Sequence, residues 1–302
     1  MLRFVGRAVD RLLSRGEGLD ATGDPFGAPL APDEVSSLLR RARETRAADT
    51  LPFQSPLPPP GGSATVEVRI VGASSRWALV APHYGSLAHP SRLGVTGGLV
   101  GALRRRGYAV ALLALPYHAG RALPGHESGY GFVRADLGAT QRAILAATAE
   151  TMALARHLRE ARGARRLLGI GVSLGGAGLG LAAALDAPFD ALGFLAAVDS
   201  PASFYATGQN REARRRTLSA QGFGPREIEA AFAPTAPSSF PAPRAPCVFA
   251  IPPEDGVVPA PAQERWREAW QGRALLLRGH GHGTALASPR VARRLVATFD
   301  ED

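Results

Sequence analysis

The sequence of 302 residues contains one cysteine, Cys247, and no lysine. A single thiol cannot form a disulfide within the chain, so this composition is compatible with a reducing compartment. The N-terminal residues lack a basic segment followed by a long apolar stretch, so we expect no secretory signal and a cytoplasmic protein. A chain of this length buries enough surface to fold without disulfide or metal crosslinks.

The sequence also lacks the motifs of several classes of binding protein. It contains no P-loop and no intact GxGxxG motif, which argues against a dinucleotide site. Four histidines outside the candidate site show no metal-binding spacing such as His-Glu-x-x-His: His89, His118, His126 and His157. We therefore expect neither a metal nor an organic cofactor.

The basic residues show no pattern typical of nucleic-acid binding. All 35 are arginines, and the formal net charge is +9, a balance that can favour nucleic acids or anionic membrane surfaces. The arginines nevertheless lie in short runs, such as 104–106 and 214–216, without interleaved aromatic residues. We expect solvated arginine-rich faces and no nucleic-acid partner.

One apolar run, residues 167–185, approaches the length of about 20 residues that a membrane-spanning helix needs. Its middle is rich in glycine, however, which predicts a buried strand, a tight turn and a buried helix. We therefore expect no membrane span.

The first 62 residues predict an N-terminal extension. Arginines recur every four residues over 1–18, opposite apolar side chains, as in an amphipathic helix packed on the domain; peripheral contact with an anionic membrane surface is the alternative. A second helix is expected over 35–48. Five prolines within 52–62 indicate a linker.

From residue 63 to the C-terminus the pattern predicts one α/β domain, because apolar strands alternate with helices. The expected strands are 66–70, 77–81, 108–115, 167–172, 191–198, 247–251 and 274–277, and the expected helices are 92–106, 136–162, 174–185, 263–270 and 290–299. Several strands are continuously apolar, as in a parallel sheet covered on both faces.

A long segment between two of these strands, about 200–246, interrupts the alternation. It begins with a polar helical stretch, 212–232, and continues with a proline-rich stretch. We interpret it as a cap over the C-terminal edge of the sheet, with an ordinary long crossover as the alternative.

A candidate nucleophile, Ser173, stands in the pentapeptide Gly-Val-Ser-Leu-Gly. An apolar strand runs directly into this motif, and a helix of small residues leaves it. Such a turn strains the serine and exposes its hydroxyl above the sheet. Side chains at Gly171 or Gly175 would clash across the turn.

A serine hydroxyl needs an imidazole to take its proton and a carboxylate to orient that imidazole. We favour Asp255 as the acid, in the loop after the strand 247–251, over Glu254 and Asp199. For the base we favour His282, with His280 as the alternative.

An oxyanion needs two hydrogen-bond donors. We expect the backbone N–H of Leu174, directly after the nucleophile, and that of Tyr84, in the loop Pro-His-Tyr-Gly-Ser after the second strand. Gly85 or Ser86 are alternatives to Tyr84. His83 is expected to be structural.

Together, His83-Tyr84-Gly85, the Ser173 motif, Asp255 and His282 resemble the α/β-hydrolase superfamily over about residues 64–300. The stretch Leu-Pro-Tyr-His-Ala-Gly-Arg at 115–121 resembles the group related to α/β-hydrolase domain-containing protein 18, and the His-Gly-Thr at 282–284 resembles dienelactone-hydrolase-like enzymes. The resemblance implies the α/β-hydrolase fold, a mostly parallel central sheet with helices on both faces and a short cap insertion.

The expected activity is hydrolysis of a carboxylic ester or related acyl bond in a small-molecule substrate. Ser173 attacks, His282 transfers the proton, and Asp255 orients His282. A peptidase or amidase using the same triad, and a non-catalytic binding or membrane-associated protein with this scaffold, are the alternatives. The residues leave the acyl group and the oligomeric state open.

Overall fold

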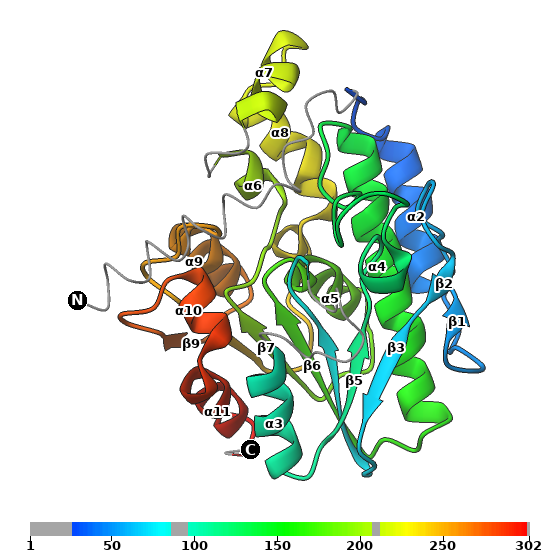
Figure 1. Ribbon diagram of the computed structural model, residues 1–302, viewed down its shortest axis with the longest axis vertical. Helices are drawn as coiled ribbons and strands as arrows, with labels where there is room; N and C mark the ends of the chain where they lie inside the picture. Colours follow the sequence, from blue (N-terminus) through cyan, green and yellow to red (C-terminus); the bar gives the residue numbers. More distant parts are fainter. Residues whose placement is uncertain (1–25, 86–95, 207–211, 301–302) are drawn as a thin grey trace.

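A computed structural model describes residues 26–85, 96–206 and 212–300 (Figure 1). The expected amphipathic helix over 1–18 lies outside these residues, as do Ser86 and His89. The centre of the fold is a seven-stranded sheet with the order β3-β5-β4-β6-β7-β8-β9. Its strands are β3 (Val68–Val71), β4 (Arg76–Ala81), β5 (Ala109–Leu113), β6 (Arg166–Val172), β7 (Ala191–Leu195), β8 (Cys247–Ile251) and β9 (Arg273–Leu276).

All neighbouring strands in this sheet are parallel except the β3–β5 pair, which is antiparallel. The five neighbouring strands β5, β4, β6, β7 and β8 are buried along almost their whole length, as expected for parallel strands with helices on both faces. The predicted fold class is therefore confirmed.

Helices cover the two faces of the sheet and form two apolar cores. One core contains α4 (Leu137–Glu160), α5 (Gly175–Ala184) and α9 (Ala260–Ala269). The other contains α3 (Gly97–Arg105), α10 (His282–Ala287) and α11 (Pro289–Ala297). Glycine permits close packing of α4 on α5, because a Cβ at Gly178 would lie 2.8 Å from the Cβ of Ala147.

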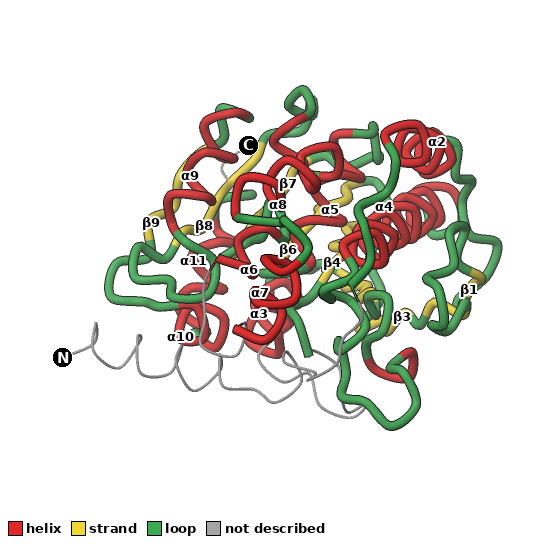
Figure 2. The backbone as a smooth tube through the Cα atoms, turned by 90° about the horizontal axis from the view of Figure 1, so that it is seen from above, coloured by secondary structure: helices red, strands yellow, loops and turns green. Residues whose placement is uncertain are grey.

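The N-terminal extension runs along the outer side of α4. Its helix α2 (Pro32–Arg43) lies beside α4, as Figure 2 shows. Strand β1 (Phe53–Gln54) pairs antiparallel with β2 (Thr65–Val66) and forms a separate two-stranded sheet. This small sheet was not expected from the sequence, which predicted a linker over 52–62.

The described part of residues 200–246, for which we keep the proposed name cap, lies beyond the C-terminal ends of the parallel strands (Figure 1). It contains α6 (Ala202–Ala206), α7 (Glu212–Ala220), α8 (Pro225–Phe232) and the 3-10 turns Ala233–Thr235 and Pro237–Ser239. The polar stretch 212–232 is largely helical, as expected, and it forms two helices because the chain turns at Gly222, with a φ of 82°. Pro225 then begins the next helix.

One further difference concerns a helix. The short helix α10, which begins at His282, was not expected from the sequence. The apolar run 167–185 forms β6, a tight turn and α5, as expected. Among the described residues, no helix is long and apolar enough to cross a membrane.

Candidate active site

Ser173 occupies the turn between β6 and α5, in the left-handed region with a φ of 51°. A non-glycine residue at positive φ is strained and persists only where its surroundings enforce it. Here its N–H donates to the carbonyl oxygen of Leu195 at 3.0 Å. A Cβ at Gly171 would lie 2.7 Å from the Cα of Gly176, and one at Gly175 would lie 2.1 Å from the carbonyl oxygen of Ala81. The turn therefore requires both glycines.

A continuous series of hydrogen bonds joins Ser173, His282 and Asp255. The Ser173 Oγ lies 2.9 Å from His282 Nε2, and His282 Nδ1 lies 2.9 Å from Asp255 Oδ2. A carboxylate only accepts, so Nδ1 carries the proton and Nε2 is free to accept from the serine hydroxyl. All three side chains are buried at the C-terminal end of the sheet.

Backbone and side-chain donors hold the Asp255 carboxylate in place. Its Oδ1 accepts from the N–H groups of Val257 and Val258, at 2.8 and 2.7 Å. Its Oδ2 also accepts from the amide of Gln263 at 3.1 Å, and the same amide donates to the Val258 carbonyl oxygen. The role of Gln263 was not expected from the sequence, since a glutamine near the start of a helix carries no signal of such a role.

The alternative acids and base lie elsewhere. Glu254 accepts from the Gly279 N–H at 3.2 Å. Asp199 binds Ser238 through both carboxylate oxygens, and burial raises its pKa. The Nδ1 of His280 is buried without a hydrogen-bond partner. The structure thus brings His282 and Asp255, rather than these residues, to Ser173.

The loop expected to form the oxyanion hole runs directly against the nucleophile turn. A Cβ at Gly175 would lie 2.6 Å from the carbonyl oxygen of Pro82, so loop and turn are in close contact. His83 Nδ1 donates to the Tyr84 carbonyl oxygen at 2.7 Å. Burial lowers the pKa of His83, and the nearby His282 lowers it further. The donor roles of Leu174 and Tyr84 remain predictions.

Residues 115–121 form a second loop beneath Tyr84. Tyr117 and Ala119 adopt positive φ values of 64° and 55°. The fully buried ring of His118 packs edge-on against the Tyr84 ring, with centroids 5.6 Å apart. Its Nδ1 donates to the Pro116 carbonyl oxygen at 2.8 Å. Burial lowers the pKa of His118 to about 4, so its ring is neutral near pH 7.

A buried ion pair anchors this second loop to α4. Arg121 and Glu150 are 1% and 0% exposed, and two parallel bonds of 2.7 Å join guanidinium and carboxylate. Arg121 also donates to the carbonyl oxygens of Ala114 and Ser63, at 2.8 and 3.2 Å. Bidentate geometry and additional acceptors are what a buried pair needs to offset its desolvation.

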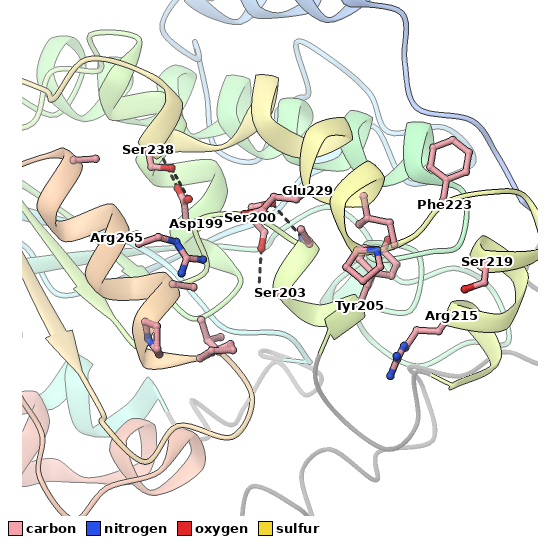
Figure 3. Close-up of a pocket in the computed structure, with 18 residues that line it drawn as sticks. Asp199, Ser200, Ser203, Tyr205, Arg215, Ser219, Phe223, Glu229, Ser238 and Arg265 are labelled. Atoms are coloured by element: carbon pink, nitrogen blue, oxygen red, sulfur yellow. Dashed lines mark hydrogen bonds between the residues drawn. The ribbon is translucent and has the colours of Figure 1, made fainter.

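A cleft of about 520 Å³ separates the cap from α9 (Figure 3). This volume lies within the range of small-molecule sites. Tyr205, Phe223 and Ile228 line the cap side, and Arg265 lines the α9 side. Val258, whose N–H binds Asp255, is also part of the wall. Ser173, His282 and Asp255 are not among the lining residues, and Val258 connects the wall of the cleft to Asp255 through its N–H.

No protein-family model matches the chain, and no curated protein does. Several solved structures are similar in fold. Acetyl xylan esterase 1 from Thermoanaerobacterium sp. aligns over 89% of this chain and 96% of its own, with 13% identity and a TM-score of 0.58. Est1E from Butyrivibrio proteoclasticus, solved with ferulic acid, aligns over 82% and 99%, with 12% identity and a TM-score of 0.56.

A puromycin-hydrolyzing peptidase from Mycobacterium tuberculosis aligns over 76% of this chain and 35% of its own, with 17% identity and a TM-score of 0.55. Identities this low show a shared fold alone. The closer resemblance of residues 115–121 to one group stays a prediction. With its sheet order, its two helical layers and these structural neighbours, the chain has the α/β-hydrolase fold.

Proposed function

We propose that this protein is a serine hydrolase that cleaves a carboxylic ester or a related acyl bond through an acyl-enzyme. The observation that carries the proposal is the unbroken hydrogen-bonded series from Ser173 through His282 to Asp255. Its order, serine to imidazole to carboxylate, matches what activation of a hydroxyl requires.

In the first half of the reaction, Ser173 Oγ attacks the carbonyl carbon while His282 Nε2 takes the hydroxyl proton. The resulting imidazolium is stabilised by Asp255, which stays ionised. The C–O bond to the alcohol then breaks, and Nε2 returns the proton to the departing alkoxide. The acyl group is left as an ester of Ser173.

In the second half, a water molecule takes the place of the alcohol. His282 accepts its proton as the oxygen attacks the acyl-enzyme, and Ser173 leaves with that proton. In both tetrahedral intermediates we assign the oxyanion to the backbone N–H groups of Leu174 and Tyr84. Contact of the Pro82 carbonyl with Gly175 supports this assignment, because it keeps the two segments adjacent.

Labelling with a fluorophosphonate probe tests the proposal. We expect the protein to be labelled, Ser173→Ala to be unlabelled, and hydrolysis of p-nitrophenyl acetate by that variant to fall by about 10⁴-fold or more. Ser36→Ala is the matched control, since Ser36 lies on the exposed surface of α2. A folded protein that takes up no label, or full activity in Ser173→Ala, contradicts the proposal and favours a non-catalytic role.

A further inference from the structure

We infer that residues 26–31, here called the strap, hold the cap in place and thereby determine which substrates the cleft admits. Gln141 is the positioning residue through which the strap acts on substrate specificity. This inference rests on the proposed hydrolase activity for its kinetic consequences. Its structural basis is a set of contacts that meet at the first two turns of α4.

The strap is bound to the start of α4 by its backbone. The carbonyl oxygens of Gly27 and Ala28 accept from the N–H groups of Leu137 and Gly138, at 2.9 and 3.1 Å. These N–H groups have no partner within the helix, so the strap completes the helix terminus. Gly27 is pressed against Asp136, where a Cβ would lie 2.2 Å from the carboxyl carbon. The position of the strap is thereby fixed relative to α4.

Gln141 connects the strap to the cap. Its side chain is 1% exposed and uses both ends of its amide. The Oε1 accepts from the Leu30 N–H of the strap at 2.7 Å, and the Nε2 donates to the carbonyl oxygen of Ala231 in α8 at 2.8 Å. Leaving either buried partner unsatisfied costs about 1–3 kcal/mol. One side chain therefore joins three segments: the strap, α4 and the cap.

A second contact lies near the other end of α8. The rings of Phe26 in the strap and Phe223 in the cap are 5.4 Å apart. Phe223 precedes α8, whereas Ala231 lies in its last turn. The cap is thus held near both ends of α8, by Phe26 at one end and by Gln141 at the other. Two such contacts restrict both tilting and translation of α8.

The position of α8 determines the shape of the cleft. Phe223 and Ile228 line one side of it, and Ala262 and Arg265 of α9 line the opposite side. The α9 side is bound to the site itself, because Gln263 donates to Asp255. A displacement of α8 therefore widens or narrows the cleft while the hydrogen-bonded series around His282 stays in place.

Gln141→Leu and Phe26→Ala separate this role from a simple contribution to stability. Gln141→Leu removes both amide hydrogen bonds at similar volume, and Phe26→Ala removes the partly buried Phe26 ring with its contact to Phe223 while leaving both amide hydrogen bonds in place. Glu34→Gln is the matched control: it weakens the ion pair between α2 and Arg142 of α4, and neither of these residues lines the cleft.

Hydrogen exchange of the α8 amides is measured for all variants. KM is measured with two series of esters. In one, p-nitrophenyl esters carry acyl groups of increasing length; in the other, alkyl esters carry alcohol groups of increasing size.

We expect exchange in α8 to become about tenfold faster in Gln141→Leu and less so in Phe26→Ala. KM for the largest esters of one series should change by about fivefold or more, with kcat on p-nitrophenyl acetate within about twofold of the parent protein. Glu34→Gln should change neither quantity. If Gln141→Leu does not fold, Phe26→Ala carries the test.

Two results overturn the inference: unchanged exchange in α8, or faster exchange with unchanged KM profiles in both series. Failure of the proposed function is distinguishable from either, because it appears as absent fluorophosphonate labelling of the parent protein. In that event the exchange measurement still tests whether the strap holds the cap.

Discussion

The catalytic end of the sheet and the cap are held in place by different kinds of interaction. Ser173 is positioned by backbone hydrogen bonds and by a tight turn in which Gly171 and Gly175 leave no room for a side chain. Single side chains fasten the described part of the cap. Gln141 of α4 donates to Ala231, the Tyr205 hydroxyl donates to the Arg134 carbonyl oxygen just before α4, and Asp199, after β7, accepts from Ser238. The proposed reacting groups are therefore preorganised by the fold, whereas the cleft beside the cap depends on a few replaceable contacts.

The largest effect is expected for Asp255→Asn, which should lower kcat without changing the position of the cap. In Asp255→Asn, Oδ1 can still accept from Val257 and Val258, which places the amide nitrogen against His282 Nδ1. His282 must then carry its proton on Nε2 and cannot accept from Ser173. We expect kcat on p-nitrophenyl acetate to fall by about 10⁴-fold, with unchanged exchange in α8. A loss below tenfold would contradict the assignment of Asp255.

The next effect concerns the ion pair beneath the catalytic end. Glu150→Ala leaves the Arg121 cation buried without its partner, which should lower the free energy of unfolding by about 3–5 kcal/mol. Urea unfolding measures this loss. The double variant Arg121→Met/Glu150→Leu should regain most of it, because no buried charge remains. A loss under about 1 kcal/mol in Glu150→Ala would show that the pair is not anchoring the loop.

A smaller, pH-dependent effect is expected from His118. Burial, followed by the charges of His83 and Arg121, lowers its pKa to about 4, against about 6.5 in an unfolded chain. Protonation thus favours the unfolded state. This group's contribution is fully present above pH ~6.5 and decreases toward pH ~4, by about 1.4 kcal/mol per pH unit.

Urea unfolding at pH 7 and pH 5 checks this sign. The parent protein should lose about 2 kcal/mol more over this interval than His118→Gln, in which no imidazole is present to be protonated. Parallel losses in the two proteins would mean that His118 is accessible to protons in the folded state.

The smallest effect is expected on the cap side. Asp199→Ala removes the acceptors for Ser238 N–H and Oγ, at 2.9 and 2.6 Å, but it also removes a carboxylate whose pKa burial raises. These contributions oppose each other, so the unfolding free energy should change by about 1 kcal/mol or less. Activity on p-nitrophenyl acetate should stay within about twofold, with Asp199→Asn as the control that keeps the acceptor. A tenfold loss of kcat would place Asp199 in the catalytic machinery. It would also contradict the division between the catalytic end of the sheet and the cap.

The sequence predicted the parts of this molecule that depend on local pattern. The turn at Ser173 follows from an apolar strand, two glycines and a helix of small residues, all within one short stretch. The sheet follows from continuous apolar runs, and the order of Asp255 and His282 follows from their positions after successive strands. Each of these inferences uses residues that are neighbours along the chain.

The missed features join residues that lie far apart in the sequence. Gln141 bonds to Leu30 and Ala231, which are 111 and 90 positions away. Arg121 and Glu150 are separated by 29 positions. Single residues of these types carry no periodicity, so only the folded arrangement identifies their partners. The turn at Gly222, which divides the helical stretch 212–232 into α7 and α8, has a local signal, a glycine followed closely by a proline.

The meeting of strap and cap on α4 has a consequence for how this protein could acquire new substrates. Because the proposed reacting groups lie on the segments that follow β6, β8 and β9, we expect changes in the first turns of α4 or in the strap to reshape the cleft while Ser173, His282 and Asp255 keep their positions. A library directed at residues 26–31 and 137–142 should therefore yield altered substrate ranges among variants that remain labelled at Ser173. In this scaffold, we expect substitutions at the attachment points of the cap to alter substrate range as readily as substitutions in the walls of the cleft.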